Sequence, residues 1–246
     1  MDLVEVEGWT LDQRRAVSPQ LRAILRSRII RNDLRPMSRL SEPEIAKEYG
    51  VSRQPVREAF ITLMNEGLVE VRPQRGTYVC KIDYDAVLNA RFVREAVEAD
   101  IARKLASEGH DLLVRDLRAQ LTLQRDVSKD SPERFMELDE RFHMTLAQGA
   151  GVAKSWGFLE GIKSQMDRVR FITFEEFPIA KLIDQHERIV EFIEQKAVSG
   201  AEDAMRAHLR EILNSLPRVQ DLYPDYFENS HGLSGEKKSQ HQEERP

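Results

Sequence analysis

The pattern of apolar and polar residues changes character near residue 83. Before it, stretches with helical periodicity are followed by two short strand-like runs, 68–72 and 77–82. After it, apolar residues recur only at helical spacing. The segments with this spacing are 84–106, 112–127, 132–148, 152–171, 179–196 and 201–216. Short breaks at Gly and Pro separate them, which predicts an antiparallel bundle. We therefore expect a mainly α fold: a small N-terminal domain with a β element, followed by an all-α bundle.

The first 80 residues have the spacing of a helix-turn-helix with a wing. A first helix is predicted around 21–29, a second begins after Ser41 and a third after Ser52, with both serines as N-caps. Gly50 lies at the turn between the second and third helices. Two helices joined by a short Gly-containing turn are typical of this motif. The two strand runs, joined by a turn at 73–76, would form a two-stranded wing.

Candidate DNA contacts cluster at the start of the third helix and at the wing tip. Recognition helices contact base edges mainly with their N-terminal residues, and long hydrogen-bonding side chains are suited to this. The candidates are Ser52, Arg53, Gln54 and Arg57 on the helix, and Arg75 and Gly76 at the wing tip. The pattern alone leaves open an ordinary helical hairpin with a charged, solvated face.

Composition and charge narrow the function classes. The chain has 246 residues, enough for two ordinary domains, and a net charge of −5. Residues 11–80 hold 13 Lys and Arg against 8 Asp and Glu, so a basic N-terminal part precedes an acidic remainder. The single cysteine, Cys80, excludes a disulfide framework and a thiolate zinc cluster. The sequence shows no long apolar run or signal-like start, so we expect a cytoplasmic protein without a membrane partner.

These observations divide the chain into four expected segments. Residues 1–17 would be a loose lead-in, 18–80 the winged helix, 83–222 the helical domain and 228–246 a disordered tail. Residues 81–83 would link the two domains, and Asp83 is a candidate cap for the helix that follows.

Four polar residues lie on apolar stripes of the predicted bundle. Asp139 and His143 are four apart on one helix, and His186 and His208 are central to the stripes of two others. Burying a polar group without a partner costs about 1–3 kcal/mol, so we expect these groups to meet. One carboxylate and three imidazoles suit Zn²⁺ or a similar divalent transition metal. The alternatives are separately satisfied core histidines and a hydrogen-bonded Asp–His network without metal.

A fifth polar residue, Arg94, lies on the apolar stripe of the segment 84–106. Glu98 follows one turn later, so one interpretation is an intrahelical ion pair. The other is that Arg94 points toward the metal cavity, where a guanidinium could bind a ligand carboxylate through two hydrogen bonds.

The N-terminal motifs resemble the winged helix of the GntR family of bacterial transcription regulators. The resemblance covers about residues 18–80 and is carried by Leu40-Ser41-Glu42, Val51-Ser52-Arg53-Gln54-Pro55-Val56-Arg57-Glu58-Ala59, Glu66-Gly67-Leu68-Val69 and Arg75-Gly76-Thr77-Tyr78-Val79. The chain departs from the common family pattern at Met37, Pro43 and Gln54. The winged-helix fold is still expected despite these departures, but the resemblance does not predict which operator sequence is bound.

The C-terminal motifs are similar to the ligand-binding domain of the FadR subfamily, the FCD type. They are Leu138-Asp139-Glu140-Arg141-Phe142-His143, Asp184-Gln185-His186 and Ala207-His208-Leu209. The resemblance implies a six- or seven-helix bundle in which Asp139, His143, His186 and His208 hold a metal such as zinc or nickel. It also implies an effector-binding role for Arg94 and a small carboxylate or sugar acid as effector. The order of motifs is most similar to the rsp-type repressors of enterobacteria.

The leading functional hypothesis is a metabolite-gated transcriptional repressor of a metabolic operon. A helix-turn-helix dimer reads two half-sites, so the expected partners are a palindromic double-stranded operator and a second copy of the chain. The alternative is a metal-dependent enzyme with a DNA-binding head, since such a metal could activate water. Against it, the sequence shows no general base beside the metal set and no glycine-rich phosphate loop. A third hypothesis is a scaffold whose bundle only dimerises.

Overall fold

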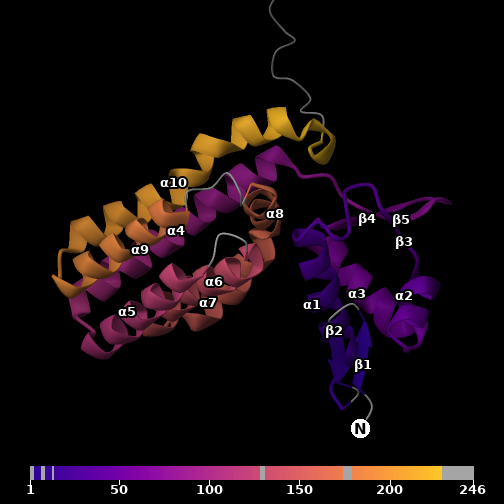
Figure 1. The fold of residues 1–246 in the computed structure, drawn as a ribbon, viewed down its shortest axis with the longest axis horizontal. Coiled ribbons are helices and arrows are strands. Elements are labelled where there is room, and N and C mark those ends of the chain that lie inside the picture. The colour runs from indigo at the N-terminus through magenta and orange to yellow at the C-terminus, as the bar shows by residue number, and fades with distance from the viewer. Residues whose placement is uncertain (1–2, 7–8, 13, 128–130, 174–178, 229–246) are drawn as a thin grey trace, which may run out of the picture.

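The computed structural model describes residues 3–6, 9–12, 14–127, 131–173 and 179–228. A small N-terminal domain with a β-sheet lies beside a larger helical domain (Figure 1). The expected fold class is confirmed: the chain is mainly α, with a small antiparallel sheet that follows the N-terminal helices. No helix in the described part of the chain is both long and apolar enough to cross a membrane.

The N-terminal domain is a helix-turn-helix with a wing. Its elements are α1 (Val17–Ile30), β3 (Arg39–Leu40), α2 (Glu42–Glu48), α3 (Arg53–Asn65), β4 (Val69–Arg72) and β5 (Gly76–Val79). Apolar faces of the three helices meet in one core that includes Leu25, Tyr49 and Leu63. Gly50 has φ +63°, a left-handed conformation that favours glycine and lets the chain turn from α2 into α3.

The two serines expected to cap α2 and α3 occupy the N-cap positions, but neither hydroxyl bonds a backbone amide. The predicted positions of the two serines are therefore confirmed, whereas the predicted capping hydrogen bonds are wrong. A capping side chain bonds the N–H of the second or third helical residue. Pro43 is the second residue of α2 and Pro55 the third of α3, so each helix lacks one of those amides. Asp83 behaves as expected and accepts hydrogen bonds from the amides of Asp85 and Ala86.

The wing has three strands rather than two. β5 pairs antiparallel with β4 on one side and with β3 on the other. β3 has only two residues, too few for an alternating pattern to be visible in the sequence. β5 ends at Val79, earlier than expected, and Ile82 instead forms a parallel bridge with Phe227 near the end of the described chain.

The segment expected to be a loose lead-in contains a β-hairpin. Strands β1 (Leu3–Val6) and β2 (Trp9–Asp12) pair antiparallel. Leu11 is fully buried in the winged-helix core, and the side chain of Gln20 bonds both the amide and the carbonyl of Asp12. These contacts hold β2 against α1.

The helical domain contains seven helices within the described residues. They are α4 (Tyr84–Glu108), α5 (Asp111–Asp126), α6 (Pro132–Gly149), α7 (Ala153–Ile162), α8 (Ser164–Ile172), α9 (Ile179–Glu194) and α10 (Val198–Leu222). The segment 152–171, expected as one helix, is two helices that meet at Lys163. The last helix continues through Pro217 beyond its expected end, because Val219 is buried beside Ile82 and Phe227. The tail expected to be disordered lies outside the described residues, apart from Glu228.

Helix α8 turns toward the N-terminal domain and packs against α1. Its polar residues are buried in this contact. Gln165 donates to the carbonyl of Gly67 at 2.7 Å, and Arg168 donates to the carbonyl of Cys80 at 2.9 Å. Polar side chains that need partners in the other domain explain why α8 breaks from the direction of α7.

Candidate functional site

The four residues singled out on apolar stripes meet in the middle of the helical domain. Asp139 and His143 come from α6, His186 from α9 and His208 from α10. One candidate ligand atom from each lies within 4.8 Å of all the others, and all four residues are buried. The sequence prediction that these groups meet therefore agrees with the geometry.

The outer nitrogen of each imidazole faces an acceptor oxygen. Nδ1 of His186 is 2.9 Å from Oε1 of Gln124, and Nδ1 of His208 is 3.1 Å from Oε1 of Gln185. Both amides are oriented by their other end: Gln124 donates to the carbonyl of Leu138 and Gln185 to Glu211. In each pair the amide oxygen therefore accepts, and the imidazole carries its proton on Nδ1.

The third imidazole has a carboxylate as its outer neighbour. Oε2 of Glu98 lies 2.5 Å from Nδ1 of His143, without the alignment of a hydrogen bond. Burial alone would raise the pKa of Glu98, but the guanidinium of Arg94 lowers it to about 2, so this carboxyl is ionised. A carboxylate has no proton to give, so Nδ1 of His143 carries the proton as well.

The inner nitrogens converge on one point. Nε2 of His208 is 3.2 Å from Nε2 of His186 and 3.2 Å from Nε2 of His143. When all three imidazoles are neutral with the proton on Nδ1, three lone pairs face one another inside the cluster. A cation resolves this arrangement, and neutral imidazoles oriented by outer hydrogen bonds are how proteins hold divalent transition metals.

Burial sets the protonation of two of these imidazoles. It lowers the pKa of His186 to about 3, and it holds the pKa of His208 well below its ordinary value, with His186 adding to the effect. Both side chains are therefore neutral near pH 7, the form that binds metal.

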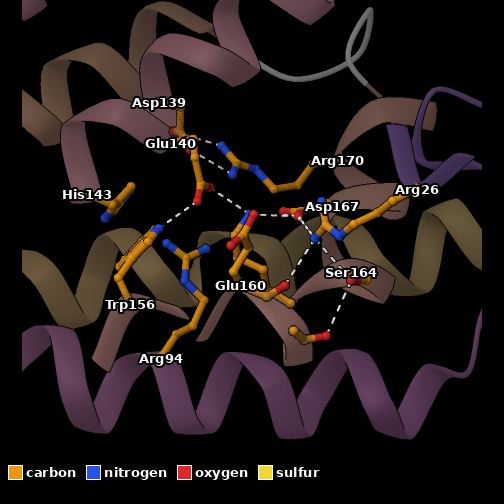
Figure 2. Close-up of polar contacts among 12 residues, drawn as sticks. Arg26, Arg94, Asp139, Glu140, His143, Trp156, Glu160, Ser164, Asp167 and Arg170 are labelled. Carbon is orange, nitrogen blue, oxygen red and sulfur yellow. Dashed lines mark hydrogen bonds and ion pairs between the residues drawn. The ribbon is translucent and has the colours of Figure 1, made fainter. Parts of the chain in front are cut away.

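The carboxylate of Asp139 also pairs with an arginine of the same chain. Arg170 on α8 donates from Nη1 to Oδ2 of Asp139 at 2.8 Å, and its Nη2 lies 2.7 Å from Oδ1 (Figure 2). Oδ1 has no well-aligned hydrogen bond, although it is buried and lies 3.6 Å from Nε2 of His186. Burial would raise the pKa of Asp139, but the guanidinium of Arg170 holds it well below its usual value. A buried, ionised and incompletely bonded oxygen beside three lone pairs fits a metal ligand.

The structure shows the first interpretation of Arg94, the intrahelical ion pair, and its role toward an effector stays a prediction. Its Nε donates to Glu98 at 2.6 Å, which is the intrahelical pair. It also lines a cavity of about 30 Å³ together with Arg170 and His208. The cavity has room for one or two water molecules, and two guanidinium groups and an imidazole face it.

The candidate DNA-binding residues lie at two places of the N-terminal domain, the start of α3 and the tip of the wing. Arg53, Gln54 and Arg57 of α3 are exposed, as are the N-cap residue Ser52 and Arg75 at the turn between β4 and β5. Gly76 has φ +111°, and a Cβ there would lie 3.1 Å from Nε of Arg39. Its contribution in the structure is to shape the wing tip.

Arg57 has a partner that the sequence did not suggest. Its guanidinium donates twice to Glu42 of α2, at 3.1 and 3.0 Å. The hydrogen bonds to Glu42 raise the pKa of Arg57 above its ordinary value. The side chain is thus held across the two helices of the motif.

Sequence reasoning missed the residues that orient the cluster. Gln185 precedes His186 in a motif that was noted, so its position gave a signal. Gln124 and Arg170 gave none, because a polar residue on a predicted helix is expected on the solvated face. Their role follows only from the way the helices pack.

Comparison with known proteins agrees with this geometry. Residues 18–79 match the family described as bacterial regulatory proteins, gntR family, and residues 90–211 match the FCD domain. The chain is 37% identical over 219 residues to the HTH-type transcriptional repressor RspR of Escherichia coli K12, covering 88% of this chain and 96% of that protein. It is 36% identical over 204 residues to an HTH-type transcriptional regulator of Streptomyces ambofaciens, covering 82% and 86%.

A solved structure, McbR/YncC of E. coli, has a similar fold, with a TM-score of 0.67 at 15% identity, covering 82% of this chain and 97% of that one. Because the relatives are transcription regulators, the alternative of a metal-dependent enzyme is set aside. The chain belongs to the GntR family of transcription regulators and carries an FCD domain.

Proposed function

We propose that this protein is a repressor of a metabolic operon whose DNA affinity is set by a small carboxylate or sugar acid. The acid binds beside a divalent metal, zinc or nickel, held by Asp139, His143, His186 and His208. A relative that is 37% identical is named a repressor, which supports the direction of regulation.

The convergence of the three Nε2 atoms is the observation that supports a metal ion in this cluster. Each Nδ1 is turned outward onto an oxygen, so the three inner lone pairs have no proton of their own to share. A hydrogen-bonded network without metal would need at least one imidazole charged or turned over. Burial lowers the pKa of His186 and His208, which works against the charged form of these two imidazoles.

The small cavity supports an anionic effector. Arg94 and Arg170 both face it, and His208 forms part of the same wall. A guanidinium binds a carboxylate through two parallel hydrogen bonds, and a zinc ion accepts a carboxylate oxygen as a ligand. About 30 Å³ is too small for a sugar acid, so binding has to displace the surrounding helices, α8 among them.

Movement of α8 would reach the DNA-binding domain through a run of charged groups. Asp167 lies one turn before Arg170 on α8 and is 2.7 Å from Nζ of Lys163. Arg26 of α1 donates to Ser164 at 3.0 Å and to Asp167 at 3.5 Å (Figure 2). Arg26 also pairs with Glu66, just after the recognition helix α3, at 3.3 Å. These contacts supply a physical route from the metal cluster to α3.

On the DNA side, the proposal assigns base reading to Arg53, Gln54 and Arg57 and groove contact to Arg75. All four side chains are exposed. Ser52 and Gly76 adjoin them and would contact the backbone of the duplex. Two copies of the chain would read the halves of a palindrome.

The test combines metal analysis with one variant. Protein purified without chelator or affinity tag should contain about one equivalent of a divalent metal, and Zn²⁺ or Ni²⁺ should raise the melting temperature of stripped protein. His186→Ala should lose this response and the response to sugar acids while keeping its DNA affinity. His110→Ala is the control, because His110 lies outside the cluster. Protein without metal, and without any response to added metal, would refute the metal part of the proposal.

A further inference from the structure

A larger cavity lies between the two domains, and we call it the α1/α8 cavity. Its walls come from α1 of the N-terminal domain and from α6, α7 and α8 of the helical domain. Its volume is about 310 Å³, against about 30 Å³ for the cavity beside the candidate metal cluster. Small-molecule sites usually occupy about 300–1,000 Å³ and often lie at interfaces between domains. Its size and its position therefore suit a small ligand.

One wall of the α1/α8 cavity contains a buried ion pair. Lys163 and Asp167 are only 4% and 2% exposed. Nζ of Lys163 lies 2.7 Å from Oδ2 of Asp167 and 2.6 Å from Oε2 of Glu140. Burial would raise the pKa of Asp167, but the ammonium of Lys163 lowers it below its ordinary value, so this carboxyl is ionised. A buried carboxylate needs partners for both of its oxygens.

The carboxylate of Asp167 has partners on only one oxygen. Oδ2 faces Lys163 and, at 3.5 Å, Arg26 of α1, whereas the buried Oδ1 has no hydrogen-bond partner among the described residues (Figure 2). Glu160 of α7 lines the same cavity. Its backbone carbonyl accepts from Arg26, but its carboxylate has no hydrogen bond or ion pair within the described chain. The cavity wall thus offers acceptor oxygens that the protein leaves unused.

The positive charges of the cavity wall, in contrast, are all paired with carboxylates. The pairs are Arg22 with Glu66, Arg26 with Glu66 and Asp167, Arg31 with Glu133, Lys163 with Glu140 and Asp167, and Arg170 with Asp139. An anionic ligand would have to displace one of these carboxylates. A cationic ligand would meet acceptors that are already in place, so the electrostatics of the cavity favour a cation.

The rest of the wall is apolar. It is formed by Ala23 and Ile30 of α1, Met136 of α6 and Phe171 of α8. Such a surface suits a short hydrocarbon chain, because burial of apolar area is favourable. An ammonium group at the end of that chain has three N–H donors, and its hydrogen bonds to a carboxylate are among the stronger ones in proteins.

We propose that the α1/α8 cavity binds a small organic compound with a primary ammonium group on a short carbon chain. The ammonium donates to Oδ1 of Asp167, with the carboxylate of Glu160 as a second negative charge on the same wall. This ligand differs in charge from the acid of the proposed function, and its site contains none of the four candidate metal ligands. Because the walls belong to both domains, a bound amine favours the contact of α1 with α8.

The experiment titrates the full-length protein, stripped of metal by chelator, with n-pentylammonium chloride at pH 7. Saturation-transfer NMR should detect binding with a dissociation constant on the order of 1 mM, as expected for a probe of about six non-hydrogen atoms. Sodium pentanoate has the same chain length and the opposite charge. It should not displace pentylammonium, even if it binds elsewhere in the helical domain.

Three variants locate the bound probe. Asp167→Asn should raise the dissociation constant for pentylammonium by about tenfold or more, and Glu160→Gln by about threefold, since its half-buried carboxylate is partly screened by solvent. Glu191→Gln is the matched control, because Glu191 is a half-buried glutamate of α9 that does not line the cavity. Ala23→Phe replaces an exposed residue of the wall and should block the cavity without changing any charge. Circular dichroism and melting curves check that each variant is folded.

The possible outcomes separate this inference from the proposed function. Absence of pentylammonium binding, its displacement by pentanoate, or binding that Glu160→Gln and Ala23→Phe leave unchanged would overturn the inference. Binding that these two variants weaken, in a protein that neither contains nor responds to a divalent metal, would overturn the metal part of the proposed function and leave the amine site standing.

Discussion

Arg170 and Asp139 form a buried, two-point ion pair between α8 and α6, with nitrogen–oxygen distances of 2.7 and 2.8 Å. Asp139 is at the same time one of the four candidate metal ligands. An oxygen that binds a metal is a poorer acceptor for a guanidinium. Under the proposed function, a metal bound to these four residues would therefore bear directly on how firmly α8 is held.

This pairing predicts a stability defect that depends on metal. Arg170→Met leaves the carboxylate of Asp139 buried without its cation, which should cost stripped protein about 3–5 kcal/mol of unfolding free energy. Zn²⁺ should restore much of this loss, because a metal would then neutralise Asp139. Denaturant unfolding with and without chelator measures both the loss of stability and its recovery with metal. Arg103→Met is the control, since Arg103 pairs with Asp100 at the surface, where both side chains are exposed, and its loss should matter little. Equal losses in the two variants would count against the buried pair.

The buried imidazoles predict a loss of stability in mild acid. The pKa of His186 is about 3 in the folded protein, below the ordinary value of about 6.5 in the unfolded chain. Between these values the unfolded state binds a proton that the folded state does not, so stability is complete above about pH 6.5 and falls as the pH drops toward 3. His208 contributes in the same direction. For stripped protein the slope should approach about 1.4 kcal/mol per pH unit for each imidazole.

Unfolding measured between pH 7 and pH 5, in the presence of chelator, checks this prediction. His186→Asn should flatten the curve by removing one proton-binding site from the unfolded chain. The carboxyl of Glu98, with its pKa lowered to about 2, contributes only below about pH 4.5 and leaves this window undisturbed. A pH-independent stability over the window would show that the imidazoles are not held neutral.

Sequence patterns predicted the architecture where periodicity is long. Amphipathic stripes identified the helices of the bundle and placed Asp139, His143, His186 and His208 on inward faces. They could not show that 152–171 bends at Lys163, because an apolar period continues across the bend. The bend depends on partners in the other domain, such as the carbonyl that accepts from Arg168.

The four residues of the candidate site could be predicted from the sequence, but the residues that orient them could not. A histidine on an apolar stripe is conspicuous, whereas Gln124 and Arg170 resemble ordinary surface residues until the helices are packed. Similarly, Arg57 is visible as a base-reading candidate, but its pairing with Glu42 depends on the angle between α2 and α3.

That pairing predicts opposite effects of two substitutions on DNA binding. Arg57→Ala should weaken specific binding by about tenfold or more if the side chain reads a base through two hydrogen bonds. Glu42→Gln should strengthen binding to specific and random DNA alike, because it frees Arg57 and removes a negative charge near the duplex. Fluorescence anisotropy at two salt concentrations measures both. If Arg57→Ala weakens specific and random binding equally, the residue contacts only phosphate.

The contact between Arg26 and α8 predicts a variant in which metal or effector no longer affects DNA binding. Arg26 donates to Ser164 and Asp167 of α8 and pairs with Glu66 beside α3. Arg26→Gln should keep its affinity for DNA and for Zn²⁺, since the residue touches neither. The factor by which Zn²⁺ together with a binding sugar acid shifts DNA affinity, typically about 5–150-fold in such couplings, should fall toward one.

Arg22→Gln provides the matched control for this experiment. Arg22 lies one turn away on α1 and also pairs with Glu66, but this ion pair stays within the N-terminal domain. It should leave the coupling factor unchanged. The factor is measured both ways, as DNA affinity with and without ligand and as ligand affinity with and without DNA, and the two values have to agree because linkage is reciprocal. A full coupling factor in Arg26→Gln would place the route between the domains elsewhere, with the linker at 81–83 as the remaining covalent connection.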